Sequence, residues 1–531
     1  MQELAIGGVK DFEFNIKDPN FLNEQALWEE AKRVYSKCKD CRMCVTYCPS
    51  FPALFDAVDR HEDDLQKLSK EELALPLELC FHCKQCYFKC PYTPPHEWRI
   101  DFPHLSLRYK VWKFKNKGAK LTDKLMLNTD LVGKLSVPFA PIVNKLNTIP
   151  TFRVIMEGVM GVDRRAKLPT INSETFTSWF RKNRKPVKGQ NGKVALFYTC
   201  LLNYNYLERG KALLKVFEKN DIYVELPEQQ CCGIPFFDIG DIDSATEKAR
   251  FNVQRLKHYV DAGFDIVVPV PTCALQIKYE YPLLLPDDPD VKAVSERVYD
   301  VHEYLFKLHQ EKRFNKDFMV SLGNIAYHIP CHLKSLNVGY RAVALMRLIP
   351  NTKVQIIERC SGHDGTFGVR KETFDMSIRV GSKLFEDMKN SNADLYVSDC
   401  PLSGNHIELM TGKRRYFELI GRTIERALRK DCLIIFFGSA VRENFGRASD
   451  IDVALFCSEP LSFTEYSRLL SEIEELPILR DVDLVDLWRV DSYDFLSKIL
   501  EEGLFWKSSE ELMRLLRRRL EGLRKSEVKT S

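Results

Sequence analysis

The chain has 531 residues, of which 45% are hydrophobic and 29% are charged, and its formal net charge is +4. This length accommodates about three or four globular domains, and this composition excludes a wholly disordered chain. The mild positive charge gives no reason to expect a nucleic acid as partner, and it allows only a weakly basic face toward an acidic one.

Residues 1–17 mix acidic and basic side chains and lack the apolar core of a secretory signal. The chain has 17 cysteines, and without such a signal we expect them in a reducing cytoplasm. The nearest candidate for a membrane span, residues 131–143, is shorter than the roughly 20 residues that span a bilayer. We therefore expect no transmembrane segment, so that any place at the inner membrane face would come through partners.

Two cysteine runs of identical spacing, C-x2-C-x2-C-x3-C-P, lie in the first hundred residues. They are Cys38, Cys41, Cys44 and Cys48, and then Cys80, Cys83, Cys86 and Cys90. This is the spacing of bacterial two-cluster ferredoxins, in which three close thiolates hold one [4Fe–4S] cluster and the fourth reaches the other. It predicts one cluster on Cys38, Cys41, Cys44 and Cys90, and a second on Cys80, Cys83, Cys86 and Cys48. Zinc fits less well, because structural zinc takes four ligands in two pairs.

The residues around these runs are helical in pattern, with 23–35 before the first run and 70–75 before the second. We expect residues 1–100 to form a helical ferredoxin module. Residues 99–120 are basic with interleaved aromatics, which would suit a nucleic acid or an anionic lipid surface. A solvated helix that covers the module is the simpler interpretation. The proline-containing residues 101–191 are predicted to form a helical connector.

A repeat of roughly 130 residues follows, in which each strand-like segment precedes a cysteine. In the first repeat, residues 192–320, the segments 194–198, 222–226 and 266–270 precede Cys200, Cys231-Cys232 and Cys273. In the second repeat, residues 321–412, the segments 325–329, 354–357 and 395–397 precede Cys331, Cys360 and Cys400. Helical segments lie between the strands, which predicts parallel sheets with the cysteines beyond the carboxyl ends of the strands, where such sheets bind ligands.

Thiolates at three strand ends can converge on one metal cluster. The first repeat offers four, which predicts a third cluster on Cys200, Cys231, Cys232 and Cys273. The second repeat offers only Cys331, Cys360 and Cys400, because Ser361 stands where the first has Cys232. A fourth cluster there needs Ser361, His332, His363 or water as its last ligand. In both repeats the alternative is a set of buried structural thiols.

Together these motifs resemble the iron–sulfur subunits related to heterodisulfide reductase, glycolate oxidase and, above all, the C subunit of anaerobic glycerol-3-phosphate dehydrogenase. Besides the ferredoxin-type runs, the resemblance rests on Cys231-Cys232-Gly233, Pro271-Thr272-Cys273, Pro330-Cys331-His332-Leu333, Glu358-Arg359-Cys360-Ser361-Gly362-His363-Asp364-Gly365-Thr366-Phe367-Gly368 and Asp399-Cys400-Pro401. It extends over about residues 38–408. It implies an iron–sulfur protein that relays electrons from a flavoprotein dehydrogenase or reduced carrier toward a quinone or disulfide-type acceptor, with further clusters in the repeats.

Two observations qualify what the resemblance implies. Gln276 and Ser403 stand where the family's closing C-x2-C pairs have their second cysteine, which argues against a five-cysteine non-cubane cluster and against direct reduction of a disulfide. The chain also shows no glycine-rich dinucleotide fingerprint or other flavin signature. Electrons should therefore enter from a separate protein.

Residues 413–531 carry a different pattern. Gly438-Ser439 follows an apolar strand-like segment, Asp450-Ile451-Asp452 opens the next, and Asp483 lies on a later one. This resembles the minimal nucleotidyltransferase family, which implies Mg²⁺ on Asp450, Asp452 and Asp483, and a nucleoside triphosphate whose phosphates contact Gly438 and Ser439.

The acidic Glu443 follows where that family has a basic turn, which leaves catalysis by this domain open. The alternative is that Asp450 caps a turn and that Asp483 is a solvated charge. We interpret Cys432 and Cys457 as buried strand thiols that bind no metal.

The sequence thus predicts a multidomain α/β protein with a helical two-cluster ferredoxin module, two repeated cysteine-rich α/β units with parallel sheets, and a mixed α/β nucleotidyltransferase-like domain. The expected function is electron transfer as part of an oxidoreductase with several subunits. The alternative is a Mg²⁺-dependent nucleotidyltransferase whose iron–sulfur portion senses the redox state.

Overall fold

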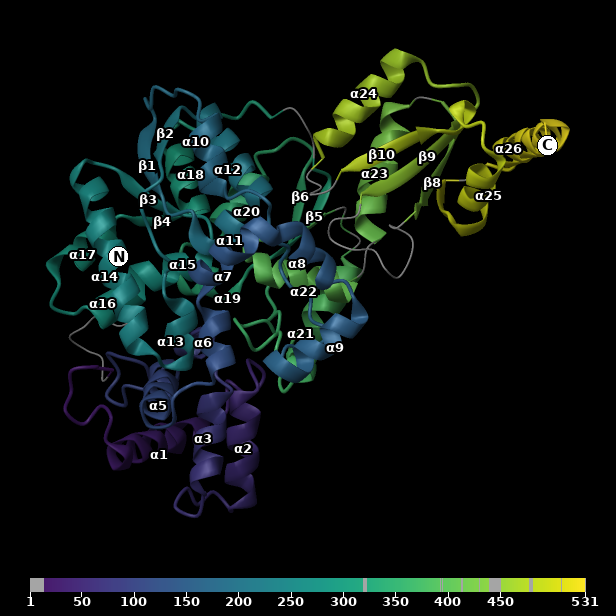
Figure 1. Ribbon diagram of the computed structural model, residues 1–531. Coiled ribbons are helices and arrows are strands. Elements are labelled where there is room, and N and C mark those ends of the chain that lie inside the picture. The colour runs from purple at the N-terminus through teal and green to yellow at the C-terminus, as the bar shows by residue number, and fades with distance from the viewer. Residues whose placement is uncertain are drawn as a thin grey trace. The chain divides into compact units, whose positions relative to one another are not determined.

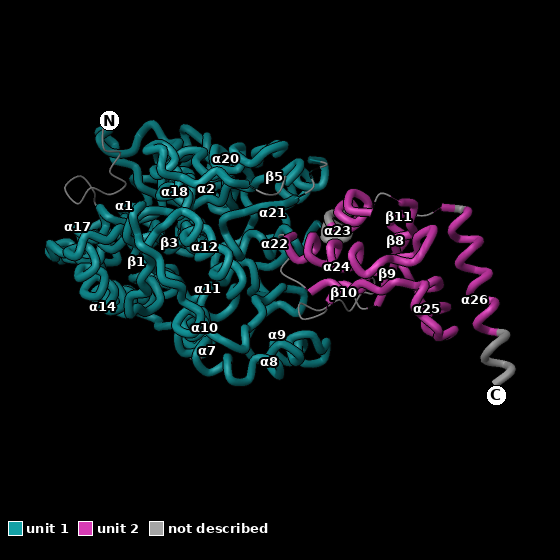
Figure 2. Tube along the Cα trace, turned by 90° about the horizontal axis from the view of Figure 1, so that it is seen from above, with its two compact units in different colours: residues 1–411 teal, residues 412–531 magenta. Residues whose placement is uncertain are grey.

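In the computed structural model the chain divides into two compact units, residues 1–411 and 412–531 (Figure 2). The structure describes residues 14–318, 322–391, 393, 395–411, 414–428, 430–438, 450–476, 481–507 and 509–530. Helices and strands are labelled in Figure 1. No helix in the described ranges is both long and apolar enough to cross a membrane.

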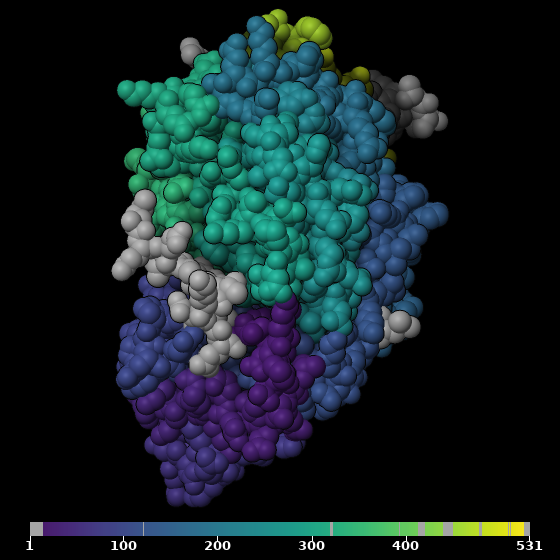
Figure 3. All heavy atoms as spheres, turned by 90° about the vertical axis from the view of Figure 1, so that its left-hand side faces the viewer, coloured from purple at the N-terminus to yellow at the C-terminus, as the bar shows by residue number. Residues whose placement is uncertain are grey.

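A small helical module forms one end of unit 1 (Figure 3, purple). Its helices are α1 Glu24–Cys41, α2 Ser50–Arg60, α3 Lys70–Glu78, α4 Gln85–Lys89 and α5 Phe102–Lys117. The Asn23 side chain caps α1, and Ser69 and Glu72 form a capping box at α3. Leu27, Leu54 and Leu77 are fully buried in its core. The module is therefore helical, as the sequence predicts.

Helix α5 belongs to two hydrophobic cores at once. Phe102, Leu105 and Tyr109 pack into the core of the module, whereas Leu107 and Val111 pack into the core that the repeats share. The helix covers the module, as the simpler interpretation expects, but its residues 102–111 are mostly buried between the two cores and not solvated. Its charged residues lie mainly in the last turns, where Lys115 and Lys117 lie.

The connector consists of short helices, several of which have a proline in the first turn. They are α6 Leu121–Leu127, α7 Thr129–Ser136, η1 Val137–Phe139, α8 Ala140–Leu146, α9 Pro150–Met160 and α10 Phe176–Asn183. Pro138, Pro141 and Pro150 each lie in the first turn of a helix, where the missing N–H has no intrahelical partner to lose.

The first repeat has a parallel sheet in the order β2-β1-β3-β4, with helices on both faces. Its elements are β1 Gly192–Leu196, α11 Thr199–Tyr204, α12 Leu207–Lys219, β2 Ile222–Glu225, α13 Ile234–Ile239, α14 Ile242–Asp261, β3 Asp265–Val268, α15 Pro271–Leu275, η2 Gln276–Glu280, α16 Tyr281–Leu284, α17 Pro289–Glu296, β4 Val298–Asp300 and α18 Val301–Gln310. Along β1, Ala195 packs toward α14, whereas Val194 and Leu196 pack toward α10, α12 and α18. Strand β4 was not predicted.

The second repeat has a three-stranded parallel sheet in the order β6-β5-β7. Its elements are β5 Asn324–His328, α19 Cys331–Ser335, α20 Arg341–Met346, β6 Lys353–Ile357, α21 Phe374–Asn390, β7 Leu395–Ser398 and α22 Pro401–Thr411. Ile325 and Tyr327 of β5 pack into the same core as β3 of the first repeat. Ala326 packs on the other face, against α21 and α22.

Unit 2 is a mixed sheet in the order β10-β9-β8-β11, with helices on both faces. Its elements are α23 Arg414–Ala427, β8 Cys432–Phe437, β9 Ile451–Cys457, α24 Phe463–Glu474, β10 Val482–Asp486, η4 Leu487–Arg489, α25 Tyr493–Glu502, β11 Leu504–Lys507 and α26 Glu510–Thr530. Alternate residues of β8 pack against α23 and α24 on one face and against α25 and α26 on the other.

Candidate metal centres

The structure brings Cys90 together with the first three cysteines of the first run. Cys38 and Cys41 lie in the last turn of α1, and all four thiols line one pocket together with Phe51 and Ile100. Burial, followed by the charge of Cys90, raises the pKa of the Cys44 thiol to about 12. Four soft donors around an apolar pocket fit a cubane iron–sulfur cluster, which is held by four thiolates.

A second group forms where the remaining cysteine of the first run, Cys48, meets the second run. Burial raises the pKa of Cys80 and Cys86, and a hydrogen bond with the Cys331 thiol, followed by burial, raises that of Cys83; the charge of Cys48 contributes to each of these shifts. The backbone N–H of His82 donates to the Cys80 sulfur at 3.4 Å, and such bonds stabilise a thiolate that ligates iron.

This second group is attached to both repeats. Lys84 is buried and forms an ion pair with Glu280 of the first repeat, which also lies 3.3 Å from the His104 ring. Burial opposes ionisation of Glu280, but the charges of Lys84 and His104 hold its pKa at about 2. On the other side, the Gln85 amide donates to the Cys331 carbonyl of the second repeat at 3.0 Å.

The four cysteines of the first repeat converge beyond the carboxyl ends of three strands, with Cys200 in α11, Cys273 in α15, and Cys231 and Cys232 in the loop after β2. Cys231, Cys232 and Cys273 are between 2% and 6% exposed, and the sulfurs of Cys232 and Cys273 are 3.4 Å apart. Hydrogen bonds with the Cys200 and Cys232 thiols hold the pKa of Cys231 well below its usual range.

Three residues that the sequence analysis did not identify hold the backbone of this site. The carboxylate of Asp130 accepts from the Cys231 N–H at 2.8 Å, Asn252 donates to the Cys231 carbonyl at 3.2 Å, and the Tyr281 hydroxyl donates to the Cys232 carbonyl at 3.0 Å. Asp130 lies on α7, in the connector. Such residues carry no cysteine-like signal, so only the tertiary structure finds them.

The three cysteines of the second repeat also gather at a strand-end edge. Cys331 is the first residue of α19, and hydrogen bonds from the Cys360 and Cys83 thiols hold its pKa well below its usual range. Backbone N–H groups donate to the sulfurs of Cys360 and Cys400 at 3.3 and 3.5 Å. The contact between Cys83 and Cys331 joins this repeat to the second ferredoxin-type group.

Within the described residues, no set of three or more His, Cys, Asp or Glu side chains is arranged to hold a single metal ion. The donor sets are four thiols in each of three groups and three thiols in the fourth, and soft thiolate ligands of this kind suit iron–sulfur clusters.

In unit 2 two carboxylates of the nucleotidyltransferase pattern lie on neighbouring strands, and Asp450 directly precedes β9. Asp452 on β9 is in register with Asp483 on β10 and with Phe437 on β8. Gly438 follows, at a φ of +69°, where a Cβ atom would meet the Asp452 carboxylate. Burial, and then the charges of Asp483 and Asp450, raise the pKa of Asp452. Ser439 and Glu443 lie outside the described residues.

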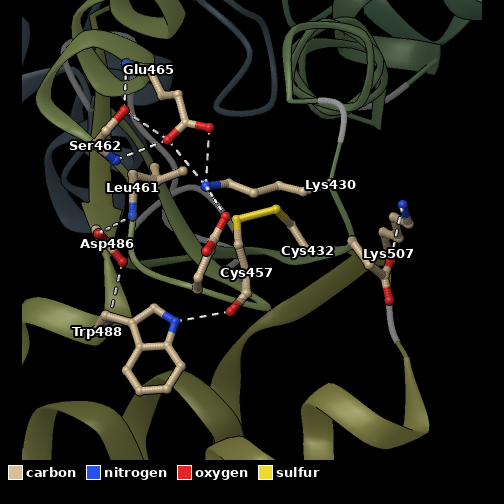
Figure 4. The surroundings of a disulfide bond; sticks show 11 residues. Lys430, Cys432, Cys457, Leu461, Ser462, Glu465, Asp486, Trp488 and Lys507 are labelled. Atoms are coloured by element: carbon tan, nitrogen blue, oxygen red, sulfur yellow. Dashed lines mark hydrogen bonds and ion pairs between the residues drawn. A yellow bond between two sulfur atoms is a disulfide. The ribbon is translucent and has the colours of Figure 1, made fainter.

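Cys432 and Cys457 form a disulfide between β8 and β9 (Figure 4). Their interpretation as free strand thiols is wrong, although both are buried as expected. The antiparallel pairing of β8 with β9 sets the two residues directly opposite each other, and the sequence alone did not specify this register. The Trp488 indole donates to the Cys457 carbonyl at 2.9 Å beside the bond.

Comparisons with known proteins match separate parts of the chain to different families. Residues 31–113 match the Citrate utilization protein B Fer4-like domain, and residues 194–278 and 325–408 both match a cysteine-rich domain. The C subunit of anaerobic glycerol-3-phosphate dehydrogenase from Escherichia coli (strain K12) is 30% identical over 305 residues, which cover 57% of this chain and 76% of that protein. The chain belongs to this family.

Two further relatives match shorter parts of the chain. Lactate utilization protein A of Geobacillus thermodenitrificans is 30% identical over 39% of this chain and 87% of its own length. The B subunit of fumarate reductase (CoM/CoB) from Methanothermobacter marburgensis is 26% identical over 48% of this chain and 50% of its own length. Residues 423–511 match the Polymerase beta, Nucleotidyltransferase family. The family relationships inferred from the motifs are confirmed, and the relatives are iron–sulfur subunits of oxidoreductases.

Proposed function

We propose that this chain is the iron–sulfur electron-transfer subunit of an oxidoreductase, which relays electrons from a flavoprotein dehydrogenase or reduced carrier toward a quinone or disulfide-type acceptor. In this proposal residues 1–100 are a two-cluster ferredoxin module, 101–191 a connector, 192–320 and 321–412 the two cysteine-rich repeats, and 413–531 a separate domain.

The observation that carries the proposal is that each of the four cysteine groups lies close to another one. The charge of Cys48, in the second group, reaches Cys44 in the first and Cys360 in the second repeat. The first repeat joins the series through Thr272, whose hydroxyl lies 2.8 Å from the His332 ring next to Cys331. A series of closely spaced redox centres is what an electron relay requires.

The cysteines of the proposed centres are buried or half-buried. Cys38, Cys41, Cys44 and Cys90 would hold one [4Fe–4S] cluster, Cys48, Cys80, Cys83 and Cys86 a second, and Cys200, Cys231, Cys232 and Cys273 a third. Such a cluster, when bound, takes up and releases single electrons, and its potential depends on nearby charge, hydrogen bonds to sulfur and solvent exposure. Lys84, Glu280 and the N–H groups aimed at sulfur supply those influences here.

Iron analysis tests this proposal. The full chain, purified and reconstituted without oxygen, should bind at least about eight iron atoms and as many sulfides in the module alone. Cys86→Ser should remove about four of them, while Lys113→Met, an exposed change in the same module, should remove none. Fewer than eight iron atoms per wild-type chain would contradict the two-cluster module.

The proposed electron donor is a separate protein, because the sequence shows no glycine-rich dinucleotide fingerprint or other flavin signature. The isolated chain should therefore reduce no dye when given glycerol 3-phosphate, glycolate or lactate. Reduction of the dye should appear only after a flavoprotein dehydrogenase is added. Dye reduction by the isolated chain would show that it oxidises substrate itself.

The exposed side chains of the connector support a position of this chain at a membrane surface. Large apolar side chains on α6 to α9 are between 39% and 69% exposed: Leu125, Leu131, Leu135, Phe139, Ile142, Ile149, Val154, Ile155 and Val159. The acidic residues of this stretch, Asp123, Asp130 and Glu157, are each paired with a basic partner. Lys124, Lys134 and Lys145 lie on the same helices. Apolar side chains flanked by lysines are typical of helices that lie in an anionic bilayer surface.

Vesicle flotation tests this position. The chain should float with vesicles that contain phosphatidylglycerol and less with purely zwitterionic ones. Leu135→Ser combined with Phe139→Ser should weaken flotation at least about tenfold. Phe463→Ser is the matched control, since this exposed phenylalanine lies in unit 2. Equal flotation of all three proteins would exclude the connector as the contact surface.

A second candidate function rests on unit 2, whose Asp452 and Asp483 lie side by side under Gly438. We infer that Asp450, Asp452 and Asp483 bind Mg²⁺ and a nucleoside triphosphate, because carboxylates can approach phosphates only when a divalent cation lies between them. Calorimetry on the full chain should show ATP or GTP binding that requires Mg²⁺ and is abolished by Asp452→Asn with Asp483→Asn. Asp494→Asn, an acidic residue on α25, serves as control.

A further inference from the structure

One buried amide of the first repeat has no hydrogen-bond partner. Gln276 is the first residue of η2 and is 0% exposed. Within the described part of the chain, neither its side-chain nitrogen nor its side-chain oxygen forms a hydrogen bond. Leaving a buried amide unpaired costs free energy, so such a group in a folded protein usually serves a bound molecule or a functional site. The amide of Gln276 therefore points to a bound group that completes it.

The helix that leads to Gln276 also carries a cysteine of the site. Cys273 lies in α15, three residues before Gln276, and the helical backbone continues from α15 into η2. Side chains three residues apart lie on the same face of a helix. The Cys273 sulfur lies 3.4 Å from the sulfur of Cys232. The amide thus belongs to the helix face that carries the thiols.

The second repeat shows which group this position faces. Ser403 lies three residues after Cys400, as Gln276 lies three residues after the last cysteine of the first repeat. The Ser403 hydroxyl is 2.9 Å from that of Ser361, and both serines are buried. Ser361 corresponds to Cys232, because each follows the first cysteine of its loop. Since the two repeats share one plan, the same geometry places Gln276 beside Cys232.

Two other polar side chains beside the first-repeat thiols are already engaged. Asn252 donates to the Cys231 carbonyl at 3.2 Å, and its side-chain oxygen accepts a backbone N–H at 2.9 Å. The Tyr281 hydroxyl donates to the Cys232 carbonyl at 3.0 Å. These two side chains hold the backbone of the loop. Gln276 differs from them, because its amide hydrogens remain available for a group that the thiols bind.

We propose that the Gln276 amide donates a hydrogen bond to the iron–sulfur cluster that Cys200, Cys231, Cys232 and Cys273 would hold, at a sulfur on the Cys232 side. This inference rests on the proposed electron-transfer function. A donor at sulfur stabilises the more negative, reduced state, so it raises the reduction potential of the cluster. In the second repeat the two serines at the corresponding positions bond to each other instead. Gln276 would therefore make the first-repeat cluster easier to reduce.

Redox titration of the reconstituted full chain, followed by electron paramagnetic resonance, tests this role. Cys232→Ser identifies the signal of the first repeat, because it should alter that signal alone. Gln276→Leu has a similar volume but no hydrogen to donate. At a fixed potential its first-repeat cluster should be about tenfold less reduced, a shift of about 59 mV for a one-electron centre. Ser403→Ala, the matched change in the second repeat, should leave this potential unchanged.

The wild-type chain gives a second readout that needs no substitution. When the side-chain amides of its glutamines carry ¹⁵N, electron spin echo spectra of the first-repeat signal should show nitrogen coupling. Gln276→Leu should lose this coupling and keep its iron content. Because the wild-type spectrum alone reports the contact, the result stands even where Gln276→Leu fails to fold.

Each contrary result contradicts a specific part of the inference. Absence of ¹⁵N coupling in the wild-type chain, or an unchanged first-repeat potential in Gln276→Leu, would overturn the hydrogen bond. An iron content that Cys232→Ser leaves unchanged would show that the first repeat holds no cluster, and would overturn this inference alone. The electron-transfer proposal fails separately, if the wild-type chain binds fewer than about eight iron atoms.

Discussion

The two cysteine-rich repeats share one plan but differ in how they surround their thiols. The first has four cysteines, a fourth strand β4 and three thiols that are nearly inaccessible, while Cys200 is half-buried. The second has three cysteines, three strands and half-buried thiols, and it lies against Cys83 of the module. The difference teaches that a duplicated fold can keep the arrangement of its donors while one copy buries more of its thiols than the other.

The largest effect should come from removing one thiol of each repeat. Cys231→Ser and Cys360→Ser should each lose about four iron atoms. Cys231→Ser should also lower the melting temperature by at least about 5 °C more than Cys360→Ser does, because ligand binding at a buried site is coupled more tightly to folding. Iron analysis and thermal unfolding of the anaerobic proteins measure both. Equal melting temperatures would remove this distinction between a buried and a half-buried thiol.

The next largest effect concerns how each repeat is attached to the module. The first repeat uses the buried ion pair of Glu280 with Lys84, and the second uses neutral hydrogen bonds of Gln85. Glu280→Gln leaves a buried charge without its partner and should cost about 3–5 kcal/mol. Gln85→Ala should cost only about 1–2 kcal/mol. Denaturant unfolding checks this order, and a reversed order would contradict the difference between the two contacts.

The glycines that follow the paired ligand positions should also respond unequally. Gly362 and Gly233 both have positive φ, but a Cβ atom on Gly362 would collide with the Ser377 carbonyl, whereas one on Gly233 would lie 3.3 Å from the Ala245 carbonyl. Both substitutions by alanine should destabilise, by about 1–3 kcal/mol, with Gly362→Ala the more severe. Melting temperatures of the two variants measured side by side decide it.

A pH effect should appear where the repeats meet at His302. Burial alone would lower the pKa of His302, but the charges of Asp399 in the second repeat and Asp300 in the first outweigh burial and raise the pKa to about 9. Because the folded pKa exceeds the usual value of about 6.5, the stabilisation is complete below pH 6.5 and is lost as pH rises through 9. The loss should be on the order of 2 kcal/mol.

Thermal unfolding at pH 6.5 and pH 9.5 measures this loss. The melting temperature should fall at the higher pH in wild type and fall less in His302→Gln. His258→Gln, on α14 away from this contact, should behave like wild type. An identical fall in all three proteins would exclude His302 as the titrating group.

The smallest effect should follow from Ser403→Ala. It removes the hydroxyl that pairs with Ser361 and should cost about 1 kcal/mol or less. If Ser361 binds no iron, the iron content and the resonance spectrum should stay unchanged. Altered spectra in Ser403→Ala would place the serine pair in contact with the cluster.

The alternation of strand, cysteine and helix was predictable because hydrophobic periodicity is local. The predicted segments at 194–198 and 325–329 correspond to β1 and β5, and Asp452 was expected beside Asp483 because both open neighbouring strands. The expected ligand sets remain predictions, although the structure gathers Cys90 with Cys38 and Cys48 with Cys80.

What the sequence could not supply depends on tertiary packing. The contact of Cys83 with Cys331 joins residues far apart in the chain. Helix α5 is buried because it packs into two hydrophobic cores, and these cores exist only in the folded chain. The disulfide of Cys432 with Cys457 depends on strand register. Pro138 and Pro150 suggest breaks in a connector, yet each lies in the first turn of a helix, since proline suits the first turn as well as a loop.

The most direct test of the electron relay is a reductive titration of the reconstituted full chain, followed by electron paramagnetic resonance. Each cubane cluster accepts one electron, so four neighbouring centres should take up about four reducing equivalents per chain, and their signals should show spin–spin interaction. Uptake of fewer than about two equivalents, or four isolated signals without interaction, would contradict a chain of closely spaced centres.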